Sequence, residues 1–243
     1  MKKYYIDEFD KLEKKHWWHI TKRELVVELI KRNLYFSEKK PEILEIGAGT
    51  ANISGEFLDK AQVTALDKSK TALSFCRKKG IRKLIHADFE KYCFFQKKYD
   101  IIIAADILEH LRDDKKALRK VSRLLKKNGL FILHVPAKIK LTSYWDKSLG
   151  HFRRYEMETI KSLAVKNGFF LTFSSYRISF LYPFIKIFRR LNKFSSKSQS
   201  SDFARFSFLN SPFLWITRIE NFLLLSGIAK FPFGTSIIAV MKK

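Results

Sequence analysis

The feature that most constrains the fold of this 243-residue chain is a series of short apolar runs, each followed by a stretch of helical character. The first run, residues 42–47, ends in Gly47. The runs that follow it lie at residues 61–67, 83–87, 99–105 and 129–135. Strands this uniformly apolar are typical of a parallel sheet that is covered on both faces and connected by right-handed crossovers. The sequence therefore predicts an α/β fold built on a doubly wound sheet.

The connecting helices are predicted from their periodicity and from residues that cap helix ends. Helices are expected at residues 69–80, 113–127 and 156–167. Ser69 and Asp113 stand where N-caps are expected, because their side-chain oxygens can accept hydrogen bonds from the first helical turn. The glycines expected just past the helix ends are Gly80, Gly129 and Gly168.

The C-terminal part of the chain contains an unusually long connection. A sixth strand is predicted at residues 169–176 and a last strand at residues 235–241. Because compact folds usually join such elements by short loops, the roughly 55 residues between them are expected to be functional or an added subdomain. This insertion holds a Ser-rich break at 195–201 and a helix candidate at 212–225. The chain is accordingly divided into an N-terminal helical cap (1–38), a central domain (39–176), a basic aromatic helical insertion (177–232) and a final strand of the sheet (233–243).

A Gly-rich turn after the first strand indicates a ligand site. Gly47 and Gly49 let a ligand approach backbone N–H groups at the carboxyl end of the sheet, where open α/β folds bind ligands. Asp67, at the end of the second strand, can accept hydrogen bonds from both hydroxyls of a ribose, and dinucleotide sites share this spacing. A dinucleotide fingerprint also needs a third glycine for helix packing, and Asn52 stands there instead. The dinucleotide interpretation is therefore weakened.

The segments LEIGAGTANIS, ALDKS, HADFE and YDIIIAADILEHL resemble the successive motifs of the class I S-adenosylmethionine-dependent methyltransferases over roughly residues 40–176. The resemblance implies that Glu45 and the glycines line the methionine end of the cofactor, that Asp67 holds the ribose, and that Asp88 with Phe89 faces the adenine. Ala51 departs from the longest glycine motif of the family. The full set of residues expected to bind S-adenosylmethionine is Glu45, Gly47, Ala48, Gly49, Asp67, Lys68, Asp88, Phe89, Asp106 and Ile107.

Segments outside that region are similar to a bacterial branch of these enzymes that is often linked to cell-surface glycan or lipid biosynthesis. They are HWWHITKRELV, LGHFRRYEMETI and KFPFGTSIIAV. The resemblance implies an N-terminal helical lid, a seven-stranded Rossmann-like sheet with an antiparallel last strand, and a helical insertion before that strand. In such a lid, His16, Trp18 and Arg23 are expected to contact cofactor or substrate.

The reaction implied by the resemblance places few demands on the enzyme. The sulfonium cofactor is already a good electrophile, so the enzyme mainly places a nucleophile in line with the methyl group and excludes water. If a base is used, His110 and His151 are the candidates, because they follow the fourth and fifth strands. The alternative for His110 is packing beneath the cofactor. His86 and His134 lie inside predicted strands and receive no site role.

An acceptor-site rim is expected in the loop after the fifth strand. Arg153, Arg154 and Tyr155 follow His151 there, and arginine makes bidentate contacts to carboxylate or phosphate. A loop with solvated charge is the alternative for this segment. No metal site is expected, because Cys76 and Cys93 lack CxxC spacing and have no His at ligand spacing.

The net charge of +24 favours a negatively charged partner. In the insertion, the pattern of an amphipathic helix that lies on anionic lipid is formed by Phe180, Tyr182, Phe184, Ile185 and Phe188 alongside Lys186, Arg189 and Arg190. Core packing of these aromatic residues is the alternative. No signal peptide and no apolar stretch of membrane-spanning length is found, so a cytoplasmic enzyme, peripheral at the inner membrane surface, is expected.

The predicted function is transfer of a methyl group to an oxygen or nitrogen of a small-molecule, glycan or lipid-linked acceptor. An RNA ribose methyltransferase stays open, although AADILEH replaces the Asn/Asp-Pro-Pro-aromatic turn of base-amino methyltransferases and Ala137 replaces the cysteine of a Pro-Cys nucleophile. An NAD(P)-dependent oxidoreductase and a non-catalytic cofactor-binding protein of the same fold also stay open.

Overall fold

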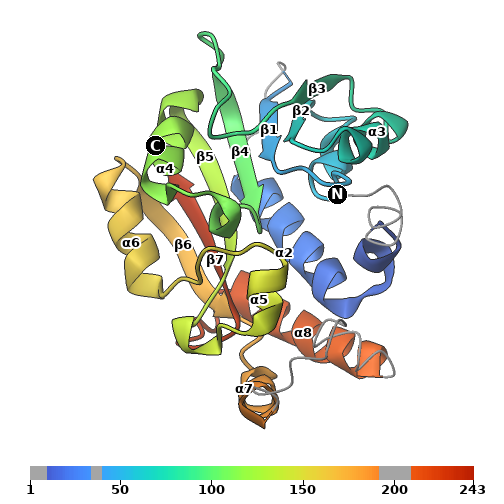
Figure 1. The fold of residues 1–243 in the computed structure, drawn as a ribbon, viewed down its shortest axis with the longest axis vertical. Helices are drawn as coiled ribbons and strands as arrows, with labels where there is room; N and C mark the ends of the chain where they lie inside the picture. Colours follow the sequence, from blue (N-terminus) through green and yellow to red (C-terminus); the bar gives the residue numbers. More distant parts are fainter. Residues whose placement is uncertain (1–9, 34–39, 192–208) are drawn as a thin grey trace.

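The computed structural model describes residues 10–33, 40–191 and 209–243, and its central feature is a sheet of seven strands (Figure 1). The strands lie in the order β3-β2-β1-β4-β5-β7-β6. Their bounds are Glu42–Ile46 for β1, Gln62–Asp67 for β2, Lys83–His86 for β3, Tyr99–Ala105 for β4, Leu125–Pro136 for β5, Phe170–Arg177 for β6 and Ser236–Lys242 for β7. Each predicted apolar run forms a strand.

The sheet is parallel except for its last strand. β1 pairs in parallel with β2 and β4, and β4 pairs in parallel with β5. β7 pairs antiparallel with both β5 and β6, so it lies inside the sheet and residues 236–241 are buried. Burial on both faces and both edges explains the continuous apolar sequence of this strand. The predicted doubly wound sheet with an antiparallel last strand is confirmed.

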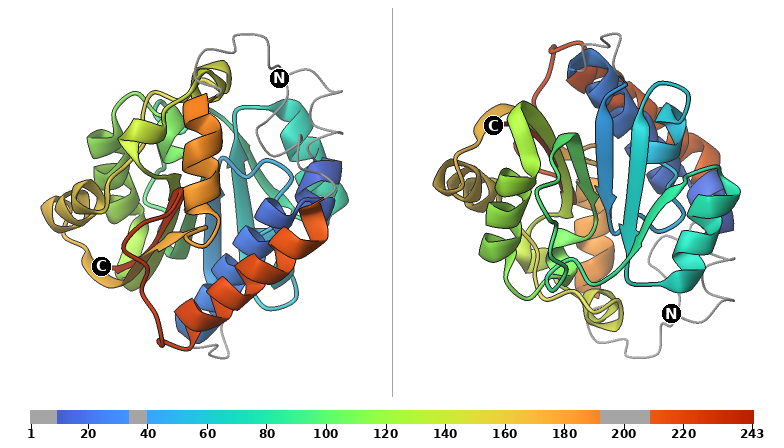
Figure 2. Two further views of the ribbon diagram at one scale, coloured as in Figure 1. Left: turned by 90° about the horizontal axis from the view of Figure 1, so that it is seen from below. Right: turned by 90° about the horizontal axis from the view of Figure 1, so that it is seen from above.

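Helices cover both faces of the sheet (Figure 2). α2 (Trp17–Asn33), α3 (Lys70–Lys78) and α8 (Asn210–Leu225) pack their apolar side chains into one core. α4 (Asp114–Leu124) and α6 (Met157–Lys166) pack into a second core on the opposite face. Because both faces are filled, the strand ends are the places where a ligand can reach the sheet.

The shorter elements lie in the connections. They are η1 (Ser54–Phe57), η2 (Leu108–His110), η3 (Ile139–Leu141), α5 (Tyr144–Ser148) and α7 (Tyr182–Leu191). η1, η2 and α7 follow the carboxyl ends of β1, β4 and β6, whereas η3 and α5 follow β5. The connections after these four strands therefore meet at one edge of the sheet.

The caps that the sequence predicts are present at α3 and α4. The Ser69 side chain accepts a hydrogen bond from a backbone N–H of α3 at 3.3 Å, and Asp113 accepts one from α4 at 2.9 Å. Gly80 and Gly168 follow α3 and α6 with φ of +100° and +75°, a region that favours glycine.

The prediction for Gly129 was wrong. The helix expected at 113–127 ends at Leu124, and β5 begins at the next residue, so Gly129 lies inside a strand. A Cβ atom at Gly129 would lie 2.9 Å from the carbonyl oxygen of Lys126 and 3.2 Å from that of Asp100. The glycine therefore serves a close approach of backbones in the sheet and does not end a helix.

The described residues of the insertion include the helices α7 and α8. α8 lies alongside α2 in both views of Figure 2, and the Asn221 side chain donates a hydrogen bond to the carbonyl of Thr21 at 2.8 Å. The Ser-rich break at 195–201 and the side chains of Phe188, Arg189 and Arg190 lie outside the described residues. In the part of the chain that the structure describes, no helix is both long enough and apolar enough to cross a bilayer.

The N-terminal helix α2 is more than a lid. Its buried residues, which include Leu25, Val26 and Ile30, belong to the core that covers one face of the sheet. Residues 10–15, which precede it, are also helical. The helices of the predicted cap and insertion pack against the same sheet as the central domain. The division of the chain into cap, central domain, insertion and final strand remains a prediction.

Gly234→Ala is expected to destabilise the protein by about 3 kcal/mol, since overpacking against backbone cannot be relieved by a side-chain rotation. A Cβ atom at this position would clash with the Arg177 carbonyl group and lie 3.0 Å from the Arg177 nitrogen. Urea unfolding of the two proteins measures the difference. The control is Gly55→Ala, whose added carbon meets only a flexible Lys79 side chain at 3.8 Å and is expected to change little.

Candidate functional site

The candidate site lies at the carboxyl ends of β1, β2, β4 and β5. The strand order reverses between β1 and β4, because the chain continues from β1 to β2 on one side and returns to β4 on the other. In the register of the sheet, Ile46 lies opposite both Leu66 and Ala104, and Ala105 lies opposite His134. The residues that follow these strands therefore meet at the topological switch point, where open α/β sheets bind ligands.

The Gly-rich turn is shaped for close approach. Gly47 has φ of +65°, and a Cβ atom there would lie 2.7 Å from the Ile107 side chain. Gly49 has φ of +54° and donates its backbone N–H to the Asp67 carboxylate at 2.9 Å. The neighbouring Ala48 is buried and bonds through its N–H to the carbonyl of Leu66 at 3.1 Å. The structure thus brings these predicted cofactor residues together.

Asp67 is fixed from two sides. Its carboxylate accepts the N–H of Gly49 and, at 2.7 Å, the N–H of Ser69. Burial raises the pKa of this carboxyl, while the two backbone hydrogen bonds act in the opposite direction. The backbone carbonyl of Lys68 faces His86 Nε2 at 3.1 Å, so Lys68 borders the same turn.

Glu45 is a buried carboxyl beneath the Gly-rich turn. It is 4% exposed and accepts hydrogen bonds from the Ser54 hydroxyl at 2.5 Å and the Ser54 N–H at 3.2 Å. Burial raises its pKa to about 7, against the lowering effect of those hydrogen bonds. Sequence reasoning missed a second carboxyl, Glu13, which accepts hydrogen bonds from Thr50 and, at 2.6 Å, from the Asn52 amide.

The two residues expected to face the adenine occupy different positions. Asp88 follows β3 and accepts the N–H of Glu90 at 2.9 Å. The Phe89 side chain is 4% exposed and packs in the core, with its ring centroid 6.1 Å from that of Phe94 and the Lys120 ammonium 4.8 Å above it. The Phe89 ring therefore serves packing, and its adenine contact stays a prediction.

Asp106, whose side chain is partly exposed, is the centre of a network with the buried residues Lys22, His134 and Arg177. It follows β4 with φ of +59°, and its carboxylate lies 2.7 Å from Lys22 Nζ and 2.8 Å from His134 Nδ1. The other ring nitrogen of His134 lies 3.2 Å from the Arg177 guanidinium, which also donates to the Thr21 hydroxyl. Burial would raise the pKa of Asp106, but Lys22 and His134 hold it well below its usual range.

Sequence reasoning missed most of this network. It assigned no site role to His134 and did not single out Lys22 or Arg177. The available signal was His134 itself, a polar residue near the carboxyl end of β5, after the apolar run of residues 129–133. Trp18 borders the network, since its ring lies 4.6 Å from Lys22 Nζ and 5.8 Å from the His134 ring.

The remaining cap residues lie further from the switch point. His16 is 8% exposed and stacks at 5.5 Å on the Trp17 ring. Arg23 approaches Glu56 of η1 at 3.9 Å. The predicted contacts of His16, Trp18 and Arg23 with cofactor or substrate stay predictions, and Trp18 lies nearest to the charged residues of the site.

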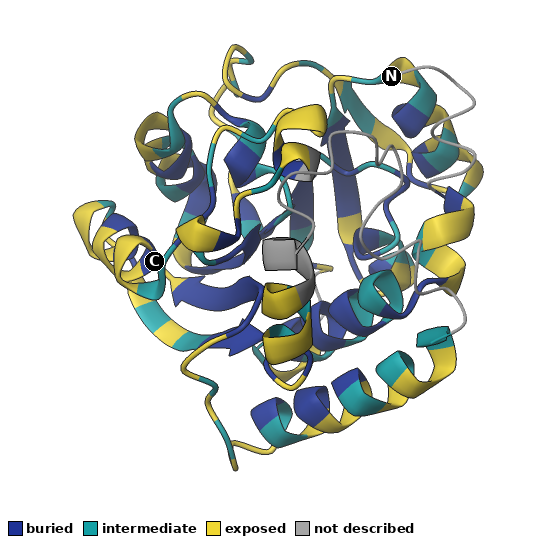
Figure 3. Ribbon diagram, turned by 60° about the horizontal axis from the view of Figure 1, so that its bottom comes forward, coloured by how far each residue is buried: buried dark blue, intermediate teal, exposed yellow. Residues whose placement is uncertain are grey.

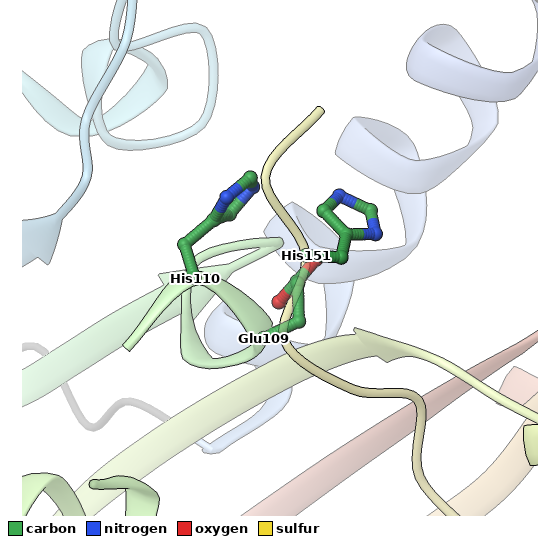
Figure 4. A group of neighbouring side chains, drawn as sticks. All are labelled: Glu109, His110 and His151. Carbon is green, nitrogen blue, oxygen red and sulfur yellow. The ribbon is translucent and has the colours of Figure 1, made fainter. Parts of the chain in front are cut away.

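The two predicted base candidates lie side by side. His110 ends η2, and His151 reaches it from the loop after α5, with ring centroids 4.6 Å apart (Figure 4). Burial lowers the pKa of His110 to about 4, and the neighbouring His151 acts in the same direction, so His110 is neutral at pH 7. Glu109, beside them, is fully buried, and burial with the nearby Asp106 raises its pKa well above the usual range.

The predicted rim residues are engaged within the protein. Arg154 is buried and forms an ion pair with Asp146 at 2.7 Å. Tyr155 is 1% exposed and donates its hydroxyl to Asp114 at 3.1 Å, and Arg153 reaches the same carboxylate at 3.1 Å. These pairs position the loop that carries His151. A substrate contact stays a prediction for the three residues, and the burial of Arg154 and Tyr155 weighs against it.

The chain is similar in sequence to methyltransferases. A family model described as a methyltransferase domain matches residues 44–133. An uncharacterized protein of Methanocaldococcus jannaschii is 30% identical over 172 residues, which are 69% of this chain and 72% of that protein. A probable S-adenosylmethionine-dependent methyltransferase of Mycobacterium tuberculosis is 25% identical over 53% of this chain, and the match spans about half (48%) of the relative.

One further sequence relative and one solved structure are also similar to this chain. The ubiquinone biosynthesis O-methyltransferase of Rickettsia prowazekii is 27% identical over 56% of this chain and 60% of its own length. The crystal structure of the YcgJ protein from Bacillus subtilis superposes with a TM-score of 0.58 at 20% identity, over 90% of this chain and 97% of the other. The latter similarity concerns the fold alone.

Glu45→Gln is expected to stabilise the ligand-free protein at pH 8 but not at pH 4. The folded pKa of Glu45 is about 7, above the roughly 4.3 of an unfolded glutamate, so wild-type stability falls as the pH rises from about 4 to 7. Glutamine removes this loss and can still accept from Ser54. Urea unfolding across pH 4–8 measures the free energy of unfolding of both proteins. The control is Glu158→Gln, because the side chain of Glu158 is 81% exposed. Equal pH profiles for Glu45→Gln and wild type would contradict the expectation.

Proposed function

The chain belongs to the class I S-adenosylmethionine-dependent methyltransferases, and on that premise we propose that it methylates an oxygen or nitrogen atom of a small-molecule, glycan-linked or lipid-linked acceptor. Bound S-adenosylmethionine supplies an electrophilic methyl group. The residues of this chain have to place the acceptor, exclude water and receive its proton. The acceptor class is the part of this proposal that goes beyond the family.

The observation that carries the proposal is the pairing of His110 with His151 beyond the carboxyl ends of β4 and β5. His110 is neutral at pH 7, so it can accept a hydrogen bond from an acceptor hydroxyl or ammonium, but its lowered pKa makes it a weak base that orients the acceptor more readily than it takes the proton. Among the relatives, the Rickettsia protein is named as an O-methyltransferase, which supports a hydroxyl acceptor for this chain. In this proposal, the loop held by Arg154 and Asp146 positions His151 as the second proton acceptor.

The residues at the switch point fit the cofactor. Glu45 lies beneath the turn where a methionine ammonium group would need a carboxylate, and Gly47 and Gly49 have the positive φ that lets a ligand approach their backbone. Each oxygen of Asp67 accepts one backbone N–H and keeps a lone pair for a ribose hydroxyl. We assign these four residues to S-adenosylmethionine, with Asp106 and Ile107 closing the pocket.

Asp67→Ala is expected to weaken S-adenosylmethionine binding about tenfold or more, because hydrogen bonds to a charged acceptor are lost. Calorimetric titration of wild type and variant with S-adenosylmethionine, and separately with NAD(H), tests this. The control is Asp59→Ala, at an exposed residue after η1, which is expected to bind as wild type does. Binding of NAD(H) in place of S-adenosylmethionine would overturn the assignment and favour an oxidoreductase.

We also propose that the chain works at an anionic membrane surface, as a peripheral enzyme on the cytoplasmic side. α8 carries Trp215, Ile219 and Phe222 along one stripe, with side chains 66%, 54% and 65% exposed. Figure 3 shows exposed residues along the outer side of this helix, away from α2. Exposed Phe184 on α7 adds to the apolar surface, and a net charge of +24 favours anionic lipid. A lipid-linked acceptor would meet the enzyme there.

Trp215→Ser with Phe222→Ser is expected to reduce co-sedimentation with vesicles that contain phosphatidylglycerol, since both side chains would leave the headgroup boundary. Wild type is expected to bind these vesicles more strongly than vesicles of phosphatidylcholine alone. The control is Val165→Ser on α6, at a 75% exposed residue outside the stripe. Equal binding with and without anionic lipid would contradict the proposal, and binding to structured RNA instead would favour a ribose methyltransferase.

A further inference from the structure

Three potential ligand residues converge at the carboxyl edge of the sheet. Glu109, His110 and His151 each offer one ligand atom, and these atoms all lie within 4.8 Å of one another. Figure 4 shows Glu109 and His110 on one turn, with His151 brought over them by the loop that follows α5. The backbone fixes this arrangement, because the Phe152 N–H donates to the Glu109 carbonyl at 2.8 Å.

The side chain of Glu109 is an independent indication that a cation binds here. The residue is 1% exposed, and within the described part of the chain its Oε2 atom is buried without a hydrogen-bond partner. A buried carboxyl oxygen is costly unless it is paired with a hydrogen-bond partner or a cation. The nearest cationic side chains are already engaged, since Lys22 binds Asp106 and Arg154 binds Asp146.

His151 is oriented as metal-binding histidines are. Its Nδ1 atom lies 3.1 Å from an Asp146 carboxylate oxygen, which receives the imidazole N–H and leaves the lone pair on Nε2. Asp146 is itself 2% exposed and is held by the Arg154 guanidinium and, at 2.8 Å, by the Ser143 N–H. A carboxylate behind a ligating imidazole fixes its tautomer and ring orientation.

From this geometry we propose that Glu109, His110 and His151 bind a divalent transition-metal ion, which in turn binds the acceptor through an oxygen atom. Two imidazoles and one carboxylate suit ions such as Mn²⁺, Co²⁺, Fe²⁺ or Zn²⁺, and three protein ligands leave positions open for a substrate. The acceptor class inferred is a hydroxyl compound whose oxygen can ligate the ion. Lewis-acid binding would favour the deprotonated form of that oxygen, and its proton would pass to solvent, because the imidazole lone pairs would be on the ion and not free to accept it. Attack of the oxygen would form the C–O bond as the methyl–sulfur bond of S-adenosylmethionine breaks and the neutral thioether leaves.

The metal proposal deepens the methyl-transfer proposal and rests on it for the acceptor, but the ion can be tested separately. Protein stripped with EDTA and dialysed is titrated with Mn²⁺, and the paramagnetic resonance signal of the free ion counts bound metal. The same preparation is titrated with Co²⁺, whose visible absorption reports its ligand geometry. One ion per chain is expected for each metal.

Variants separate this site from adventitious binding. His151→Ala and Glu109→Gln are each expected to weaken Mn²⁺ binding more than tenfold, and Asp146→Asn to weaken it by about 10- to 100-fold through the orientation of His151. His110→Ala serves as a second ligand variant, and circular dichroism checks that each protein is folded. The matched control is His86→Ala. The His86 ring faces the Lys68 carbonyl, so this variant is expected to bind Mn²⁺ with the stoichiometry and affinity of wild type.

The results distinguish failure of the metal site from failure of the methyl-transfer proposal. Stoichiometric Mn²⁺ or Co²⁺ binding that is lost in the ligand variants and kept in His86→Ala supports the site, whether or not an acceptor is known. Absence of stoichiometric binding, or binding unchanged in folded His151→Ala and His110→Ala, overturns it. Full methyl transfer by metal-free protein would also overturn it while leaving the methyl-transfer proposal intact, with the histidine pair acting alone. Failure to bind S-adenosylmethionine would instead count against the proposed function.

Discussion

The contact between Lys22 and Asp106 determines how the parts of this protein fit together. It joins the N-terminal helix to the end of the central strand β4, and through His134 and Arg177 it reaches the ends of β5 and β6. Four charged or polar groups taken out of water are tolerated because each has a partner, and an unpaired member would be costly. The network therefore specifies where α2 sits on the sheet, and with it the position of Trp18 at the site.

The site itself is assembled from loops whose anchors are buried. The Gly-rich turn is held by Asp67 and lies over Glu45, and the loop carrying His151 is held by the Asp146–Arg154 pair. Rigid anchors of this kind position groups at the edge of the sheet while the strands supply stability. Neutral His110, buried Glu109 and His151 then lie together next to the Asp106 network. In the proposed assignment, the residues after β1 and β2 contact the cofactor, Asp106 and Ile107 after β4 close its pocket, and the histidines beyond β4 and β5 face the acceptor.

The fold could be predicted from the sequence, and residues could be proposed for the cofactor, because the signals for both are local. Apolar runs of strand length, the two glycines after β1 and an acidic residue at the end of β2 can each be recognised within a few residues. Gly129 misled the prediction, since a glycine after a helical pattern usually ends the helix, whereas here it permits close backbone approach inside β5. Lys22, His134 and Arg177 lacked a local pattern, because their meaning depends on contacts between residues far apart in the chain. The pairing of Glu109 and His110 with His151 is hidden for the same reason.

The packing of α8 on α2 has a consequence for how the chain folds as it is made. Arg218 pairs with Glu24 across 194 positions, so α2 finds this partner only after 194 further residues have been synthesised. At typical rates of about 5–20 residues per second, α2 leaves the ribosome roughly 10–40 s before α8. During that interval the side of α2 that later meets Asn221 has no α8 to cover it. Docking of α2 against α8 therefore waits until residues 210–225 have left the ribosome.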